Sequence, residues 1–290
     1  MNLFVFGMGY SSRATAEALR RLGIDDLSIA GTSREPTSDT GRGSMRLHAF
    51  GGDAPGTTLG EDLAAASHVL VSIPPDAAGD AVLRHHRAEL DRAGKLRWVG
   101  YFSTVGVYGD FGGAWVDEAA ETRPINARSL MRVAVEQQWR DYAAARGVPL
   151  LILRLAGIYG PGRSAFDRLR DGTARRIVKP GQVFNRIHVE DIGRVTALAA
   201  QRRLAGTFNL ADDAPAPPQD VVAHAAGLLG IPAPDATPFD AAEMTPMARS
   251  FYSDNKRVAN GAIKRALGIE LLYPTYREGL AAILAEERTR

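Results

Sequence analysis

The sequence predicts an α/β protein with a doubly wound parallel sheet and a smaller, mostly C-terminal lobe. Two observations predict this fold. A glycine-rich turn joins an apolar run to a helical pattern within the first 23 residues, and apolar runs alternate with helical patterns through the first two-thirds of the chain. Such alternation is typical of a parallel sheet that carries helices on both faces.

The glycine turn reads GMGYSS and directly follows the apolar run LFVF. Gly7 permits a sharp turn, and Gly9 lets the backbone approach a ligand closely. The N–H groups of Tyr10, Ser11 and Ser12 open a helix, where unpaired donors and the helix dipole favour an anion. Ser12 replaces the usual third glycine and is small enough for close packing. The turn predicts a Rossmann-type site for a dinucleotide pyrophosphate, with a purely structural turn as the alternative.

The end of the second strand, expected over 27–31, indicates which dinucleotide binds. A carboxylate there would accept hydrogen bonds from the ribose of NAD, but this chain places Thr32, Ser33 and Arg34 there. Two hydroxyls and a guanidinium suit a 2′-phosphate. The sequence therefore favours NADP, with NAD as the alternative. Ser72, near the end of a strand expected over 68–73, is a further cofactor-binding candidate.

The remaining elements of the first two-thirds follow in order. They are a strand over 47–50, a short helix after 60, the strand over 68–73, a helix over 76–92, a strand over 96–102, a helix over 127–146 and a strand over 150–155. Gly147 and Pro149 end the long helix. Beyond Gly160 the composition shifts to Pro- and Gly-rich loops, with a helix from Val189 and a strand over 207–210.

This shift predicts two domains: a dinucleotide-binding domain over 1–162 and a substrate lobe mainly over 163–290. Residues 186–212 are expected to return to the first domain.

Composition excludes several classes of protein. Apolar residues make up 45% of the chain and charged residues 23%, which are ordinary values for globular domains. The absence of cysteine excludes disulfides, a thiolate nucleophile and sulfur-ligated zinc. The first strand begins at residue 3, and no apolar run approaches membrane-spanning length. We therefore expect a cytoplasmic protein without a membrane partner.

Charge and histidine patterns argue against nucleic acid and metal. The pI is about 9.0, but the net charge is only +2 and the arginines are interspersed with acidic residues. No basic stripe with interleaved aromatics is present, so no nucleic-acid partner is expected. The adjacent His85 and His86 point to different faces of a helix. The HVED segment at 188–191 is typical of a helix start with acids on its first turn, so no metal site is predicted.

Four segments in order resemble the NAD-dependent epimerase/dehydratase family of extended short-chain dehydrogenases/reductases. They are FSTVGVYG at 102–109, LRLAGIYGPGR at 153–163, RIHVED at 186–191 and TFNL at 207–210. The resemblance implies a Rossmann domain from the N-terminal part and a substrate lobe mainly from the C-terminal part. It also implies a homodimer, since helices equivalent to 76–92 and 127–146 often pair in this family.

The family's catalytic pair does not match. The family uses a tyrosine and a lysine four residues later; with Glu136 as register, these fall on Arg128 and Arg132. Arg132 can still bind ribose hydroxyls, but an arginine stays protonated and is a poor proton shuttle. Thr104 matches the hydroxyl that bonds the reacting oxygen. Thr104, Arg132 and Arg128 are therefore the catalytic candidates, and the chain resembles the atypical branch of the family.

Other tyrosines and a histidine offer substitute acids. Tyr108, Tyr159 and His188 are candidates, each with a simpler interpretation as a packing residue. The sequence YSDNK contains the chain's only Tyr-x-x-x-Lys pair, Tyr252 and Lys256. It lies deep in the expected substrate lobe, where coincidence is the simpler interpretation.

The segment 163–186 predicts the character of the substrate. It gathers seven cationic residues against Asp167 and Asp171. Excess positive charge concentrates anions, so Arg163 and Arg186 are candidates for holding a small anionic substrate; a solvated arginine-rich loop is the alternative. Two functions remain open: an NADP-dependent oxidoreductase or epimerase-like enzyme with an unidentified proton donor, and a non-catalytic NADP-binding sensor or regulatory protein.

Overall fold

The computed structural model describes residues 1–36 and 45–289. The chain divides into two units. The first comprises Met1–Thr104, Asn126–Arg154 and Ile192–Phe208, and the second comprises Val105–Ile125, Leu155–Asp191 and Asn209–Arg290. The first unit is interrupted twice, after Thr104 and after Arg154, and the chain returns to it at Asn126 and at Ile192.

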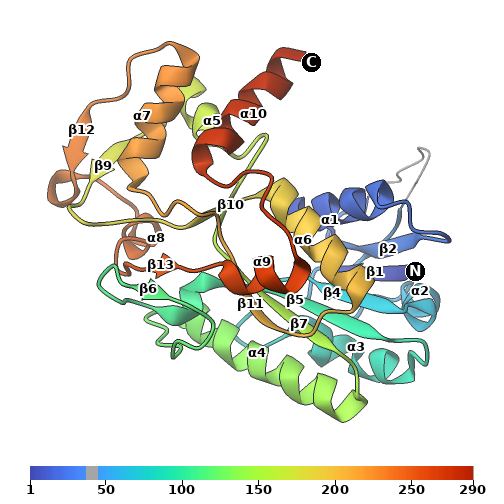
Figure 1. The fold of residues 1–290 in the computed structure, drawn as a ribbon. Coiled ribbons are helices and arrows are strands. Elements are labelled where there is room, and N and C mark those ends of the chain that lie inside the picture. The colour runs from blue at the N-terminus through green and yellow to red at the C-terminus, as the bar shows by residue number, and fades with distance from the viewer. Residues whose placement is uncertain (37–44, 290) are drawn as a thin grey trace. The chain divides into compact units, whose positions relative to one another are not determined.

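A seven-stranded sheet organises the fold, in the order β11-β7-β5-β4-β1-β2-β3 (Figure 1). The pairs β1–β2, β2–β3, β1–β4 and β4–β5 are parallel. This order confirms the predicted doubly wound, Rossmann-type α/β fold. The strands are β1 (Asn2–Phe6), β2 (Ser28–Ser33), β3 (Arg46–Ala49), β4 (His68–Val71), β5 (Trp98–Thr104), β7 (Leu150–Leu155) and β11 (Gly206–Leu210).

Helices cover both faces of this sheet. The first face carries α1 (Tyr10–Arg21) and α6 (Val189–Arg202), and the other carries α2 (Gly60–Ala65), α3 (Ala81–Arg92) and α4 (Ala127–Arg146) (Figure 1). A Cβ on Gly193 would lie 2.5 Å from the Ala14 carbonyl oxygen, so α1 and α6 approach at backbone distance. The α2–α4 face buries a core cluster that includes Phe4, Phe6 and Trp139.

Local signals set the bounds of α4. The helix occupies the predicted range, because Asn126 caps its start by accepting a hydrogen bond from Ser129 N–H and Gly147 ends it at φ +64°. The prediction for α3 was wrong at its start. The helix begins at Ala81 rather than residue 76, because Gly79 has φ +99° and the Asp80 carboxylate caps the helix at Val82 N–H and Leu83 N–H.

The second unit contains short strands and helices. Its strands form three parallel pairs, β8–β10, β9–β12 and β6–β13. A core cluster between α5, α7 and α10 includes Phe166, Tyr159 and Tyr276. The elements are η1 (Val105–Tyr108), β6 (Trp115–Val116), β8 (Gly157–Tyr159), α5 (Ala165–Arg170), β9 (Arg176–Val178), β10 (Arg186–His188), α7 (Pro218–Leu229), β12 (Ala236–Pro238), η2 (Phe239–Ala241), α8 (Pro246–Ser250), β13 (Arg257–Val258), α9 (Gly261–Leu267) and α10 (Tyr276–Thr289).

Among the residues that the structure describes, no helix has both the length and the apolar character needed to cross a membrane.

Candidate cofactor site

The glycine turn between β1 and α1 is held by the ends of two neighbouring strands. Gly7 has φ +90°, and its N–H donates to Thr32 Oγ1 at 2.9 Å, while Met8 N–H donates to the Thr32 carbonyl at 2.7 Å. A Cβ on Gly7 would lie 2.9 Å from Ile73 Cγ1 and 3.2 Å from Ile73 N. Both the backbone conformation and the neighbour therefore require glycine at this position.

Gly9 differs from Gly7, because nothing in the fold requires it. Its φ of −90° is open to any residue, and a Cβ there would meet no described atom within 4 Å. Gly9 also contributes no side-chain cap to α1, and the first turn of the helix carries no acidic residue. The start of α1 thus presents its backbone to open space, which suits the close approach of an anion.

The serines at the start of α1 are packed inward. Ser11 is buried, and Ser12 is fully buried with an Oγ that has no hydrogen-bond partner among the described residues. A small residue therefore occupies the third position of the turn, in line with the packing argument from sequence. The buried serine side chains leave the backbone N–H groups of this turn to face a ligand, and contact between them and a pyrophosphate stays a prediction.

The three cofactor-binding candidates at the end of β2 have different environments. The Thr32 side chain is fully buried and shapes the glycine turn through its hydroxyl. Ser33 Oγ donates to the Glu35 carbonyl at 3.1 Å. Arg34 is exposed, its stem runs past Gly51, and none of the described residues pairs with its guanidinium. Arg34 is therefore available to an outside phosphate.

Ser72 lies beside the same turn. Its N–H donates to the Phe6 carbonyl at 2.9 Å, and its side chain is partly exposed. This places the end of β4 next to the end of β1, where ligands of doubly wound sheets bind.

The catalytic candidates lie on β5 and α4. Thr104 is the last residue of β5 and is half-buried, and Arg128 is exposed on the first turn of α4. Arg132 Nη1 donates to Tyr101 Oη at 2.9 Å and to the Phe102 carbonyl at 2.7 Å. Sequence reasoning missed Tyr101. The available signal was a hydroxyl-bearing aromatic inside a continuously buried strand.

Glu136 anchors the inner face of α4. Its carboxylate accepts from Ser103 Oγ at 2.6 Å, from Arg154 Nη2 at 2.8 Å and from Arg140 Nη2 at 2.9 Å. Burial raises the pKa of Glu136, but the bonds from Arg154, Ser103 and Arg140 outweigh it and leave the pKa below its ordinary value. This network holds the helix turn that follows Arg132 against β5.

The substitute acids are packed within the second unit. Tyr108 is fully buried and donates to Asn209 Oδ1 at 2.7 Å. Burial raises the pKa of Tyr159 far above its ordinary value and lowers the pKa of His188 to about 4. His188 also packs against the rings of Tyr159 and Tyr273. These environments support the interpretation of all three as packing residues.

The Tyr252–Lys256 pair has two separate environments. Tyr252 packs against Phe184 and Phe239, whereas Lys256 Nζ donates to the Gly109 carbonyl at 2.9 Å and pairs with Asp254. The pair thus serves the packing of the second unit. No group of three or more metal-ligating residues occurs among the described residues.

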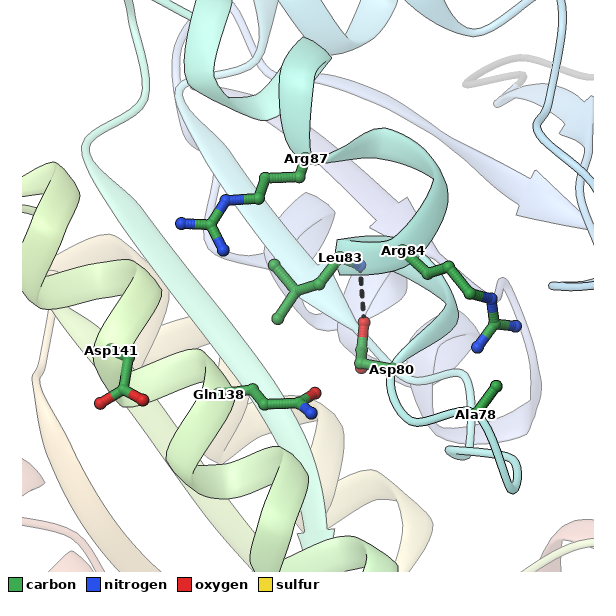
Figure 2. Close-up of a pocket in the computed structure, with 7 residues that line it drawn as sticks. All are labelled: Ala78, Asp80, Leu83, Arg84, Arg87, Gln138 and Asp141. Carbon is green, nitrogen blue, oxygen red and sulfur yellow. Dashed lines mark hydrogen bonds between the residues drawn. The ribbon is translucent and has the colours of Figure 1, made fainter.

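An open pocket in the first unit lies apart from the glycine turn, between α3 and α4. Arg84 and Arg87 extend from α3, and Gln138 and Asp141 lie on α4 (Figure 2). At its base, Asp80 accepts from Trp139 Nε1 at 3.1 Å. These helices correspond to the pair through which the resemblance implies a homodimer, which stays a prediction.

The cationic segment of the second unit is mostly engaged in its own fold. Five of its seven cations bond to other parts of that unit: Arg170 to Glu287, Arg175 to the Glu243 carbonyl, Arg176 to the Pro234 carbonyl, Lys179 to the Tyr252 carbonyl and Arg186 to the Ala216 carbonyl. Arg186 donates from Nη1 to the Phe184 and Ala216 carbonyls, and Arg163 is exposed. Burial lowers the pKa of Arg186, and nearby Asp212 opposes this shift.

Known proteins share this fold. The model of the NAD dependent epimerase/dehydratase family matches residues 63–211. The solved structure of a functionally unknown conserved protein from Silicibacter pomeroyi is 48% identical, covers 98% of each chain and superposes with a TM-score of 0.87. The structure of UDP-glucuronic acid 4-epimerase from Bacillus cereus in complex with NAD is 16% identical, covers 100% of this chain and 99% of its own, and has a TM-score of 0.76.

A curated relative is the 3-diazoavenalumate denitrifying reductase of a Streptomyces species. It is 28% identical over 144 residues, and the match spans 45% of this chain and 45% of the reductase. The chain therefore matches less than half the length of that relative. Since the family model covers more than half of the chain, the protein belongs to the NAD dependent epimerase/dehydratase family.

Proposed function

We propose that this protein binds NADP(H) in its first unit and uses it in oxidoreductase or epimerase-like chemistry on a small anionic substrate. The observation that carries the proposal is Gly9, a glycine that the fold does not need, at the uncapped start of α1. A glycine that the packing and backbone of the chain do not require indicates that a ligand approaches the backbone closely there. The NAD-bound Bacillus cereus epimerase, with a similar fold, supports the class of cofactor.

Each group near the turn has a role in this proposal. The N–H groups of Tyr10, Ser11 and Ser12 bind the pyrophosphate, with Ser72 beside them. Arg34 donates to the 2′-phosphate, with Ser33 beside it. When bound, the cofactor supplies or accepts a hydride.

The reacting end requires different groups. Arg132 binds the nicotinamide ribose, and the Thr104 hydroxyl donates a hydrogen bond to the reacting oxygen. Arg128, exposed and permanently charged, attracts the anionic substrate rather than moving a proton.

Cofactor preference is the first test. We expect NADPH to bind about 10- to 100-fold more weakly to Arg34→Ala than to the wild type, because one charge-assisted contact to the 2′-phosphate contributes about 1.5–3 kcal/mol. NADH, which lacks this phosphate, should bind equally well to both. Calorimetric titration of the two cofactors measures this.

Arg21→Ala is the matched control, since Arg21 is an exposed arginine at the far end of α1 with only a weak ion pair to Glu17. It should leave both affinities unchanged. Equal affinities of the wild type for NADPH and NADH would contradict the NADP preference, and no binding of either would overturn the proposed function.

Substrate charge is the second test. With NADPH present, we expect nucleotide-sugars or other phosphorylated or carboxylated compounds to raise the Tm, and neutral compounds to leave it unchanged. Arg163→Ala should weaken binding of the stabilising anion about tenfold or more, and added salt should weaken this binding further. Thermal-shift titration measures both effects.

Arg265→Ala, an exposed arginine of α9 in the same unit, is the control for this test. Stabilisation by neutral compounds alone would show that the arginine-rich segment is only a solvated surface.

A non-catalytic NADP-binding role is the second candidate, and one observation favours it. Both residues at the positions of the family's proton relay are arginines, and neither can release a proton near neutral pH. Steady, stereospecific oxidation of NADPH with any member of a panel of sugar-nucleotides, aldehydes and ketones would establish an enzyme. Tight NADPH binding without turnover on the panel would favour the sensor.

A further inference from the structure

Arg132 is held by β5 at one of its three guanidinium nitrogens. Nη1 donates both to Tyr101 Oη at 2.9 Å and to the Phe102 carbonyl at 2.7 Å. The guanidinium carbon also lies 5.7 Å from the centre of the Tyr101 ring. Two acceptors on one nitrogen determine where this guanidinium lies.

The other two nitrogens of Arg132 remain available. No described residue accepts a hydrogen bond from Nε or Nη2, and neither belongs to the buried polar atoms that lack a partner. The Arg132 side chain is only partly buried. One edge of the guanidinium is therefore anchored to the protein, while the other can donate to a ligand.

Tyr101 is unsuited to proton transfer with a substrate. Its side chain is fully buried in the core cluster with Trp139. Burial raises the pKa of Tyr101 to about 12, although the charge and hydrogen bond of Arg132 act to lower it. The Tyr101 hydroxyl therefore acts on Arg132 and not on a reacting atom.

We infer that Tyr101 is a positioning residue, whose hydroxyl on β5 holds Arg132 so that its free edge donates to the nicotinamide ribose of the cofactor. The inference rests on the proposed function. A long arginine side chain loses rotamer freedom when it binds, and anchoring one nitrogen beforehand reduces that loss.

The test compares two ligands on Tyr101→Phe, which keeps the ring and removes the hydroxyl. We expect NADPH to bind about 3- to 10-fold more weakly, the loss of one hydrogen bond's contribution. Adenosine 2′,5′-bisphosphate, which has no nicotinamide ribose, should bind within about twofold of the wild type. If Tyr101→Phe weakens binding of both ligands equally, the substitution disturbs the fold in general and the inference is overturned.

Tyr142→Phe is the matched control. Tyr142 belongs to the same core cluster and is equally buried, but neither hydrogen bond of Arg132 involves its hydroxyl. The Tyr142→Phe variant should bind both ligands as tightly as the wild type does.

A double-mutant cycle with Arg132→Ala completes the experiment. Arg132→Ala should weaken NADPH binding more than Tyr101→Phe does. Adding Tyr101→Phe to the Arg132→Ala variant should not weaken NADPH binding further. An additive effect would mean that Tyr101 acts independently of Arg132 and would overturn the inference. If Tyr101→Phe binds NADPH as tightly as the wild type does, the inference about Tyr101 is overturned but the proposed function is not. If the wild type binds neither NADPH nor NADH, both are overturned.

Discussion

Replacing Glu136 with alanine is expected to lower the free energy of unfolding by about 3–5 kcal/mol. Arg154 is almost fully buried and makes two hydrogen bonds to Glu136, at 3.1 Å and 2.8 Å. Without the carboxylate, the buried charge of Arg154 loses the anion with which it pairs in the core of the first unit. The Tm should fall by about 6–20 °C, as measured by thermal and urea unfolding.

Glu17→Ala is the control for this substitution. Glu17 also pairs with two arginines, Arg20 and Arg21, but its side chain is 49% exposed. Exposed pairs contribute little, so the expected loss is below about 1 kcal/mol. Equal losses in the two variants would show that the buried network does not stabilise the unit.

The same network predicts a pH dependence. The pKa of folded Glu136 lies below its ordinary value of 4.5, because the bonds from Arg154, Ser103 and Arg140 outweigh burial. The unfolded chain therefore takes up this proton first on acidification. The stabilisation is present above pH 4.5 and is lost as the pH falls through the folded pKa. Between about pH 5 and pH 3, the free energy of unfolding should fall more for the wild type than for Glu136→Gln.

Replacing Gly7 with alanine is expected to weaken NADPH binding about 10- to 100-fold. A Cβ at φ +90° is strained, and it would press against Ile73 Cγ1 and Ile73 N. Relief of this strain moves the turn away from Thr32 and with it the N–H groups at the start of α1. The affinity is measured by calorimetric titration, and stability by thermal unfolding in the absence of cofactor.

Gly23→Ala separates strain from binding. Gly23 has φ +63° just beyond the end of α1, and a Cβ there would meet nothing within 4 Å. It should cost about 1 kcal/mol of stability and leave the NADPH affinity unchanged. If Gly7→Ala binds NADPH as tightly as Gly23→Ala does, the glycine turn is structural and does not approach a phosphate.

The sequence by itself determined the features that depend on neighbouring residues. The glycine turn, the bounds of α4 from Asn126 to Gly147 and the buried strand β7 all follow from turn chemistry, capping and periodicity. These signals act within a few residues of one another. The doubly wound parallel sheet also follows, because parallel strands joined by helices have few ways to pack.

Only the tertiary structure decided which side chains meet across the sheet. Thr32 lies 25 residues from Gly7 and holds the turn with its hydroxyl, and Tyr101 lies 31 residues from Arg132 and holds its guanidinium. The sequence placed Thr32 in a ligand site and gave Tyr101 no role. A hydroxyl at a strand end or inside a strand fits either task, and its direction is set by how each helix packs on the sheet. The twice-interrupted first unit has the same origin, since its boundaries depend on contacts between distant segments.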